Sequence, residues 1–122
     1  MGMITLNAIP IFRVLDLSKA KEFYIDFLGF AIDWEHRFGS DAPVYMQISK
    51  DGLVIHLSEN VRFQTGAIVF VETNGIENFH KQLTQKNHKI LTPDIAITQW
   101  NTKQMELEDP FGNLLRFNEI NT

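Results

Sequence analysis

The chain repeats one order of secondary-structure patterns twice, and this repeat limits the possible folds more than any other feature. Each half contains a short apolar strand pattern, an amphipathic helical pattern and three further strand patterns. Equivalent positions recur at a nearly constant spacing, so that Leu17 corresponds to Ile76 and Gly52 corresponds to Gly112. Because few residues are identical between the halves, the repeat concerns the pattern of apolar and turn residues. We therefore predict two consecutive β-α-β-β-β modules.

The two modules are predicted to lie within one domain. The chain has 122 residues, and single domains typically contain roughly 100–150 residues. We place the modules at about residues 4–60 and 66–120 of a domain that spans residues 1–122, with a short polar linker between them. The predicted fold class is α+β, with both modules contributing to a curved, cup-like mixed sheet. A concave sheet of this kind would enclose a cleft for a ligand.

Capping and turn residues mark the ends of the predicted helices. Apolar residues recur at helical spacing over residues 17–28, which Asp16 can cap at the start and Gly29 can end in a left-handed conformation. In the second half, Asn74 is the predicted N-cap, and Glu77 follows it three residues later, as in a capping box. Both helices are therefore expected to begin directly after a short strand.

Strand patterns fill the rest of each half. The predicted strands are residues 9–14, 31–37, 44–49 and 53–58 in the first half and residues 67–72, 89–92, 102–108 and 114–119 in the second. Asp51-Gly52 is a hairpin signal, and Asp109-Pro110-Phe111-Gly112 is typical of a type I turn. Each turn is expected to join the last two strands of its module.

Charge and composition exclude several classes of function. The formal net charge of −4 disfavours non-specific binding to nucleic acid, which relies on a basic surface. The absence of cysteine excludes disulfides, thiolate catalysis, zinc–thiolate sites and iron–sulfur clusters. No apolar run approaches the roughly 20 residues that a membrane span needs. We therefore expect a cytoplasmic protein without nucleic-acid or membrane partners.

Two groups of residues resemble those of a known superfamily. They are Ile9-Pro10-Ile11, Asp16-Leu17-Ser18-Lys19-Ala20, Phe23-Tyr24 and Leu28-Gly29-Phe30 near the start, and Asp109-Pro110-Phe111-Gly112-Asn113-Leu114-Leu115 near the end. In this order and spacing they resemble the vicinal oxygen chelate superfamily, and within it the glyoxalase/bleomycin-resistance branch. The resemblance covers nearly the whole chain and implies the cup-shaped fold. The superfamily includes metal-dependent isomerases, dioxygenases and drug-binding proteins, so the function must be argued from the site.

The resemblance also implies where a metal would bind. Metal-dependent members usually carry His or Glu at four positions, on the first and last strands of the two modules. These positions correspond to Ile9, His56, Ala67 (or its neighbour Ile68) and Arg116. Only His56 can ligate a divalent metal, and Arg116 is a permanent cation. We therefore expect no metal and no cofactor, which disfavours glyoxalase I and extradiol dioxygenase activity.

His56 and Arg116 are candidate ligand-binding residues. Strand alternation places each of them on the face opposite the predicted helices, and the repeat makes them equivalent. Two such donors facing one cavity would suit an anionic or carbonyl-bearing ligand. The alternative is that Arg116 neutralises a nearby carboxylate, such as Glu106 or Glu108.

Three aromatic residues are the other candidates for ligand contact. Trp34 and Trp100 lie on or beside strands that flank the cup in the family, and Phe38 is a candidate aromatic wall. Tyr45 is a weaker candidate of the same kind, while His36 lies in a polar stretch and is expected to face solvent.

Together these residues predict a binding protein that lacks the metal site. It would sequester a small molecule, such as a bleomycin-like drug, in its cleft. The relatives that the resemblance implies are dimers with ligand grooves between subunits, so we expect a homodimer. The alternative is a glyoxalase-like enzyme, related to the lyases, isomerases or dioxygenases, that acts on a small carbonyl or carboxylate substrate through His56 and Arg116. A metalloenzyme with shifted ligand positions is a third hypothesis.

Overall fold

A computed structural model describes residues 2–121 and contains two modules with the same order of elements. The first consists of β1 (Ile11–Arg13), α1 (Leu17–Lys21), η1 (Glu22–Phe27), β2 (Ala31–Arg37), β3 (Val44–Lys50) and β4 (Leu53–Ser58). The second consists of β5 (Ile68–Glu72), α2 (Ile76–Gln85), β6 (Ala96–Ile97), β7 (Thr102–Glu108) and β8 (Leu114–Ile120). The predicted α+β class and the repeated β-α-β-β-β order are confirmed. The organisation as one domain, residues 1–122, stays a prediction.

Each module forms its own four-stranded mixed sheet, with the order β1-β4-β3-β2 in the first and β5-β8-β7-β6 in the second. The first strand of each module pairs in parallel with the last, and the remaining pairs are antiparallel. The registers match as well, since Ile11 pairs with His56 and Phe70 pairs with Arg116. The duplication predicted from the sequence is therefore visible in the strand pairing.

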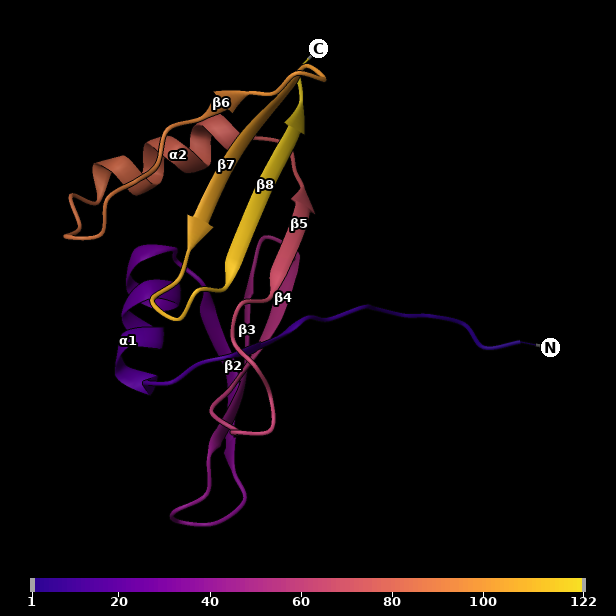
Figure 1. Cartoon of the computed structure of the whole chain (residues 1–122), viewed down its shortest axis with the longest axis vertical. Coiled ribbons are helices and arrows are strands. Elements are labelled where there is room, and N and C mark those ends of the chain that lie inside the picture. The colour runs from indigo at the N-terminus through magenta and orange to yellow at the C-terminus, as the bar shows by residue number, and fades with distance from the viewer. Residues whose placement is uncertain (1, 122) are drawn as a thin grey trace.

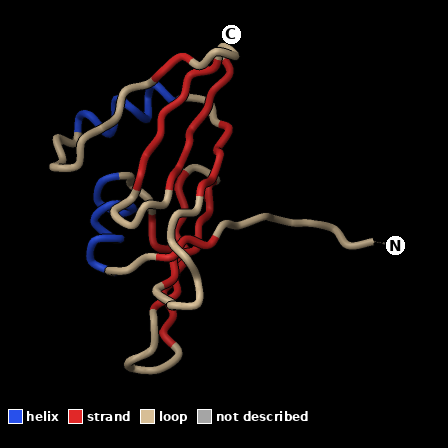
Figure 2. Tube along the Cα trace, in the orientation of Figure 1, coloured by secondary structure: helices blue, strands red, loops and turns tan. Residues whose placement is uncertain are grey.

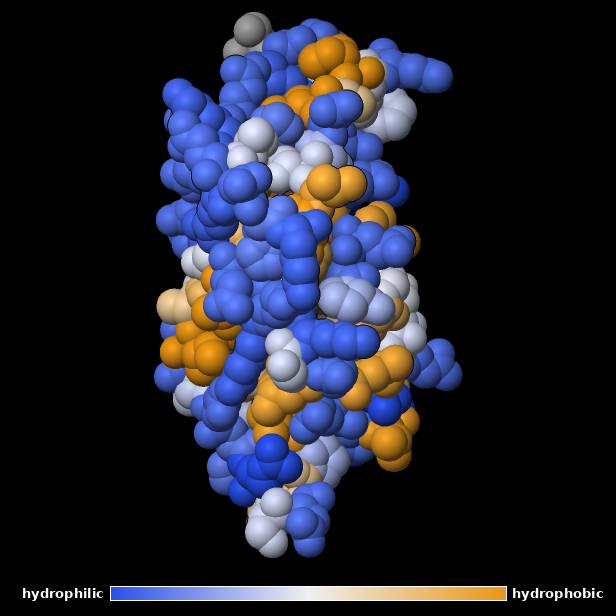
Figure 3. All heavy atoms as spheres, turned by 90° about the vertical axis from the view of Figure 1, so that its left-hand side faces the viewer, coloured by the Kyte–Doolittle hydropathy of each residue, from blue (hydrophilic) through white to orange (hydrophobic). Residues whose placement is uncertain are grey.

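Both helical segments lie on the same side of the strands, at the left in Figure 1, and Figure 2 shows the same arrangement along the trace. The strand faces that look toward the helices carry the buried apolar side chains, which form one cluster with members from both modules. On β4, for example, Ile55 and Leu57 are buried while His56 between them is only half-buried. Seen from the helical side, the surface is mainly hydrophilic with separate hydrophobic groups (Figure 3).

The first helix begins where it was predicted but changes its pitch. The Asp16 carboxylate accepts a hydrogen bond from the Lys19 backbone N–H at 3.0 Å, which confirms the predicted N-cap. After α1, the chain forms the π-helical turn η1, in which the Leu28 N–H donates to the Phe23 carbonyl at 2.9 Å. Gly29 then ends the helical segment with a positive φ of 88°, as predicted.

The second helix is capped differently from the prediction. Gly75, with a φ of 83°, occupies the N-cap position of α2, so Asn74 lies one residue outside the helix. The Ile76 N–H instead donates to the Glu119 carboxylate at 2.9 Å. Glu77 forms an ion pair with Lys103 at 2.8 Å and does not close a capping box. The helix thus receives its cap from the neighbouring strand β8, which a local motif cannot reveal.

The strand predicted at residues 89–92 does not form. The segment is irregular, and the Ile90 N–H donates to the Nδ1 atom of His88 at 3.1 Å. Pro93 follows directly, and its ring restricts the backbone of the residue before it. On the side away from β8, β7 pairs instead with the short strand β6, where Ala96 lies opposite Gln104.

The turn between β7 and β8 joins the second module to the first. Asp109 is buried in this turn, and its carboxylate accepts a hydrogen bond from the Tyr24 hydroxyl at 2.7 Å. The same carboxylate accepts from the side-chain amide of Asn113 at 2.8 Å. Burial and the neighbouring Asp109 carboxylate raise the pKa of Tyr24 well above its ordinary value, so the phenol stays a hydrogen-bond donor.

Asn113 extends this connection to three backbone segments. Its side-chain amide nitrogen donates to the carbonyl of Arg13 at 2.9 Å. Its side-chain oxygen accepts from the N–H groups of Gly66 and Ala67 at 3.0 Å and 3.1 Å. Asn113 therefore holds β1, the linker and the β7–β8 turn together, and it is only 1% exposed.

Within residues 2–121, no helix is both long enough and apolar enough to cross a membrane. The longest helix, α2, contains 10 residues.

Candidate functional site

The face of the first sheet that lies opposite the helices carries the candidate residue His56. His56 lies on β4 beside Ile11 of β1 and Gln47 of β3. Because side chains alternate along a strand, Tyr45 and Gln47 on β3 share this outer face with His56. The predicted orientation of His56 is therefore confirmed, and β3 supplies its polar neighbours.

A β-bulge in β2 brings two adjacent residues to this outer face. The register between β2 and β3 shifts between Ile32 and Trp34, which leaves Asp33 as the extra residue. The Asp33 carboxylate contacts the side chains of Gln47 and Ser49, while the ring of Trp34 lies against Tyr45. In a regular strand these neighbours would point to opposite faces. The bulge turns one of them, as bulges next to functional sites often do.

Trp34, Tyr45 and His56 form an aromatic cluster on this face. The Trp34 and Tyr45 rings are stacked, with centroids 5.9 Å apart and an interplanar angle of 13°. The imidazole of His56 lies edge-on to both, with centroid distances of 5.3 Å to Trp34 and 5.2 Å to Tyr45. Three rings from three strands thus support one another, and the exposed fraction of Trp34 is still 42%.

The aromatic cluster borders a cavity of about 660 Å³, which we call the aromatic pocket. Its lining residues are Trp34, Glu35, His36, Phe38, Tyr45, Asn60 and Phe63. Phe38 is 84% exposed, and its ring meets the ring of His36 edge-on at 4.3 Å. The size and the mainly aromatic lining suit a flat organic ligand of drug-like dimensions.

Hydrogen bonds fix the imidazole of His56 behind this pocket. Its Nδ1 atom lies 2.8 Å from the Tyr45 hydroxyl, and its Nε2 atom lies 2.9 Å from the Gln47 side-chain oxygen. Burial lowers the pKa of His56 and raises the pKa of Tyr45, because desolvation disfavours the charged form of each group. Both shifts favour the neutral forms of these groups.

The lowered pKa of His56 predicts a pH-dependent stability. The unfolded chain binds a proton at His56 more readily than the folded chain does. The contribution of neutral His56 to the free energy of unfolding is therefore complete above the unfolded pKa of about 6.5. This contribution is lost as the pH falls from about 6.5 through the lower pKa of the folded state. We expect the urea midpoint of the wild type to fall more steeply below pH 6.5 than that of His56→Gln. Equal slopes for the two proteins would contradict this assignment.

Arg116 and Trp100 lie on the second module, outside the aromatic pocket. The Nε atom of Arg116 donates to the Glu106 carboxylate at 2.8 Å across the β7–β8 pair, so the predicted pairing with a nearby carboxylate is present. Trp100 lies in the turn before β7 and is 67% exposed. The structure thus brings Trp34 and Phe38 together at the pocket, places His56 behind it, and leaves Trp100 and Arg116 apart. A ligand-binding role for these five residues stays a prediction.

The residues at the expected metal positions do not fit a metal site. Ile9, Ala67 and Ile68 have no metal-binding atom, and neither do Ile11 and Phe70, which strand pairing places beside His56 and Arg116. Both ring nitrogens of His56 already have hydrogen-bond partners. No group of three or more His, Cys, Asp or Glu residues suited to a metal occurs in the described part of the chain. We derive no chemistry through a metal.

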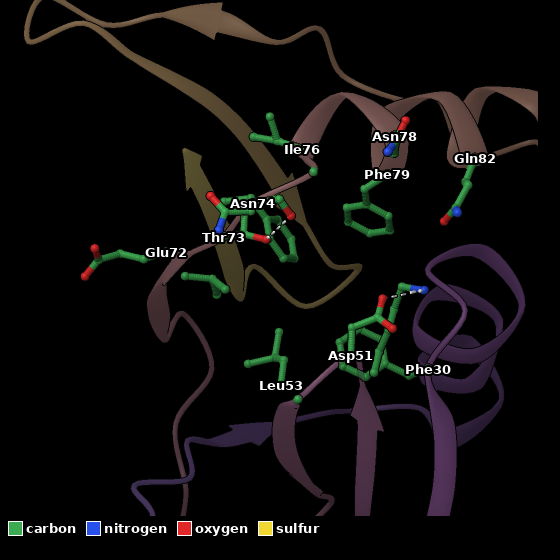
Figure 4. Close-up of a pocket in the computed structure, with 15 residues that line it drawn as sticks. Phe30, Asp51, Leu53, Glu72, Thr73, Asn74, Ile76, Asn78, Phe79 and Gln82 are labelled. Carbon is green, nitrogen blue, oxygen red and sulfur yellow. Dashed lines mark hydrogen bonds and ion pairs between the residues drawn. The ribbon is translucent and has the colours of Figure 1, made fainter. Parts of the chain in front are cut away.

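A second cavity, of about 640 Å³, lies between the β3–β4 turn and α2. Figure 4 shows Phe79 and Gln82 of α2 above the cavity, with Phe30, Asp51 and Leu53 of the first module below it. None of the five candidate ligand-binding residues lines this cavity. We therefore place the candidate site in the aromatic pocket.

Sequence reasoning gave Tyr45 a lesser role and missed several of its neighbours. Gln47 could have been found, because it lies two residues after Tyr45 on the same strand and therefore on the same face. Asp33 was hidden by the β-bulge, which breaks the alternation along β2. Phe63 and Asn60 lie in the linker, where no periodic pattern indicates which way a side chain points.

Comparisons with known proteins agree with this architecture. The model of the family described as "Glyoxalase superfamily protein" matches residues 1–122. A comparison with curated protein sequences finds no match.

Several solved structures share the fold at low sequence identity. A bleomycin-binding protein solved with bleomycin is 19% identical, with a TM-score of 0.71 over 94% of this chain and 98% of that chain. A bleomycin resistance determinant encoded on transposon Tn5 is 16% identical, with a TM-score of 0.74 over 97% of this chain and 100% of that chain. TnmS3, an antibiotic-binding protein from Streptomyces sp. CB03234, is 20% identical, with a TM-score of 0.67 over 97% of this chain and 99% of that chain. These similarities concern the fold, and a fold does not determine a function.

Proposed function

Because the chain belongs to the glyoxalase superfamily, whose model matches all 122 residues, we propose that it binds and sequesters a small, flat organic molecule without transforming it. The observation that carries this proposal is the aromatic pocket, which the stacked rings of Trp34 and Tyr45 border and to which Phe38 adds a third, exposed ring. Aromatic walls of this kind bind planar groups by stacking and by removal of apolar surface from water. A bleomycin-like drug is the ligand class that we propose, since two similar structures are bleomycin-binding or bleomycin-resistance proteins.

The environment of His56 and Arg116 supports binding over catalysis. A general base needs a free ring nitrogen within reach of a substrate proton. Both nitrogens of His56 are engaged by Tyr45 and Gln47, and the guanidinium of Arg116 is paired with Glu106. The alternative of an enzyme that acts on a small carbonyl or carboxylate substrate would require both residues to leave these partners.

We further propose that the protein is a cytoplasmic homodimer in which a second copy completes the ligand groove. Large apolar side chains are exposed on the outer faces of both sheets and in the N-terminal arm, which extends away from the modules in Figure 1. These residues are Met3, Ile4, Leu6, Ile9, Ile11, Ile68 and Phe70. Exposed apolar side chains of this kind often mark protein–protein contact sites.

The test is a titration with metal-free bleomycin, followed by calorimetry and by tryptophan fluorescence. We expect saturable binding at micromolar concentration with quenching of the tryptophan signal, because the ligand would stack on Trp34. The ligand should be recovered unchanged after release. Heat and fluorescence that both remain unchanged would remove the support for drug sequestration, whereas a chemically altered ligand would favour the enzyme.

The variant His56→Ala separates the two functions further. A binding protein should lose affinity at most, and the ligand that it releases should still be intact. An enzyme that depends on His56 should lose turnover while it keeps its fold, which far-ultraviolet circular dichroism would check.

A further inference from the structure

We propose that Tyr45 selects the ligands of the aromatic pocket, because the hydrogen bonds behind it leave its hydroxyl oxygen available only as an acceptor. The preferred ligands are then flat aromatic molecules that carry an N–H or O–H donor on their edge. This inference rests on the proposed function, since it assumes that a ligand stacks in the pocket. It adds a chemical criterion that the aromatic lining alone does not provide.

The direction of the hydrogen bonds is set at Asp33. A carboxylate can only accept hydrogen bonds. Its two oxygens accept from the Ser49 hydroxyl at 2.9 Å and from the side-chain amide nitrogen of Gln47 at 3.0 Å. Because the amide nitrogen of Gln47 must point toward Asp33, the amide oxygen must point the other way, toward His56.

The same reasoning fixes the tautomer of His56. The Gln47 oxygen is an acceptor, so the Nε2 atom of His56, at 2.9 Å, must carry the hydrogen. A neutral imidazole has one N–H group, so its Nδ1 atom is an acceptor, and burial favours this neutral form by lowering the pKa. The Tyr45 hydroxyl, 2.8 Å from Nδ1, is therefore the donor in the last hydrogen bond.

Tyr45, which lines the pocket, then has no hydrogen left for a ligand, and its hydroxyl oxygen can act toward a ligand only as an acceptor. A ligand that presents an N–H or O–H group to this oxygen completes its hydrogen bonding. A ligand that presents only an acceptor places two lone pairs against each other. Since one net hydrogen bond corresponds to about a fivefold difference in affinity, we expect selectivity of that order.

The experiment compares indazole with 1-methylindazole, two flat ligands that differ in a single N–H donor. Dissociation constants are measured at pH 8 by tryptophan fluorescence on the full chain. We expect indazole to bind about fivefold more tightly than 1-methylindazole. The dissociation constant of 1-methylindazole divided by that of indazole is the selectivity ratio. In Tyr45→Phe, which keeps the ring, this selectivity ratio should fall toward one. A ratio caused by the bulk of the methyl group would persist.

The variant Asp33→Asn tests whether Asp33 sets the direction of the hydrogen bonds that lead to Tyr45. An amide at this position can donate as well as accept, so Gln47 is free to turn and the direction of the hydrogen bonds is no longer imposed. We expect the ratio to fall while the affinity for 1-methylindazole stays the same. Asp41→Asn, which makes the same change of charge at an exposed position in the β2–β3 loop, should retain the wild-type ratio.

Nitrogen-15 chemical shifts of His56 give a readout that does not depend on any ligand. The inference requires the tautomer with hydrogen on Nε2, and the opposite tautomer would overturn it. Equal binding of the two indazoles with a clear fluorescence response would also overturn it, while the proposed function would stand. No response to either ligand up to millimolar concentration would overturn the inference, whereas the titration with metal-free bleomycin decides the proposed function separately.

Discussion

Asn113→Ala is expected to destabilise the protein by about 2–3 kcal/mol, because it removes a hydrogen bond to the buried Asp109 carboxylate and the partners of three part-buried backbone groups. The substitution removes the acceptor for the N–H groups of Gly66 and Ala67 and the donor for the carbonyl of Arg13. A buried polar group that loses its partner costs roughly 1–3 kcal/mol, and a part-buried group, which water can reach, costs less. Equilibrium urea denaturation measures the effect directly, and a loss below 1 kcal/mol would contradict the role of Asn113 as the connection between the modules.

Two further variants show that the chemistry of the side chain matters. Asn113→Asp keeps the shape and one acceptor oxygen, but it places a carboxylate against the carboxylate of Asp109, where the amide nitrogen donates at 2.8 Å. We expect it to be as destabilising as the alanine variant, because like charges at this distance repel. Asn78→Ala on the exposed surface of α2 is the matched control and should change the stability by less than about 0.5 kcal/mol.

Trp34→Ala is expected to weaken ligand binding by about tenfold to a hundredfold, since aromatic anchors in pockets carry much of the binding energy. Trp34 borders the aromatic pocket and is stacked on Tyr45, so the substitution removes one wall and loosens the other. Because 42% of the residue is already exposed, the free energy of unfolding should change much less than the free energy of binding. Calorimetric titration with metal-free bleomycin measures the loss of affinity.

Ile32→Ala is the control for this prediction. Ile32 lies on the same edge strand with a similar exposed fraction, 38%, but it does not line the pocket. It should retain the wild-type affinity. Equal losses in the two variants would point to a general weakening of β2, and wild-type affinity in Trp34→Ala would exclude stacking on this ring.

The strand-rich part of the fold was predictable because alternation and turn residues are local signals. The strands at Ala31–Arg37, Leu53–Ser58 and Thr102–Glu108 have the predicted bounds. Gly29 and the Asp109–Gly112 turn are also where the sequence places them, and the Gly112 N–H donates to the Asp109 carbonyl at 3.2 Å. Such features depend on residues close together in the chain.

The failures arose where a distant residue decides the local structure. Glu119 caps α2 from another strand, so the nearby Asn74 is not needed as a cap. The helical pattern predicts Tyr24 only as one more apolar residue of the first helix. Its hydroxyl, however, donates a hydrogen bond to Asp109 in the other module. A pattern within one element cannot report a contact between elements that are far apart in the sequence.

The candidate site was predictable only in part for the same reason. Trp34 and Phe38 were identified by residue type, and both line the pocket. The hydrogen bonds that link Asp33 to His56 needed the strand register and the bulge, neither of which is encoded by spacing alone. The sequence left Arg116 with two alternatives, a ligand-binding role or pairing with Glu106 or Glu108, and the pairing of β7 with β8 places it beside Glu106.

The pairing of the first strand of each module with its last has a consequence for how the protein can change during evolution. Backbone hydrogen bonds between β1 and β4, and between β5 and β8, close each module independently of the loops between them. The entropic cost of a longer loop grows only logarithmically, at about 0.6 kcal/mol for each doubling of its length. The β2–β3 loop, which contains Phe38, can therefore gain or lose residues while His56 keeps its place. New ligand specificities can arise at this rim without any change in the strands that hold the site.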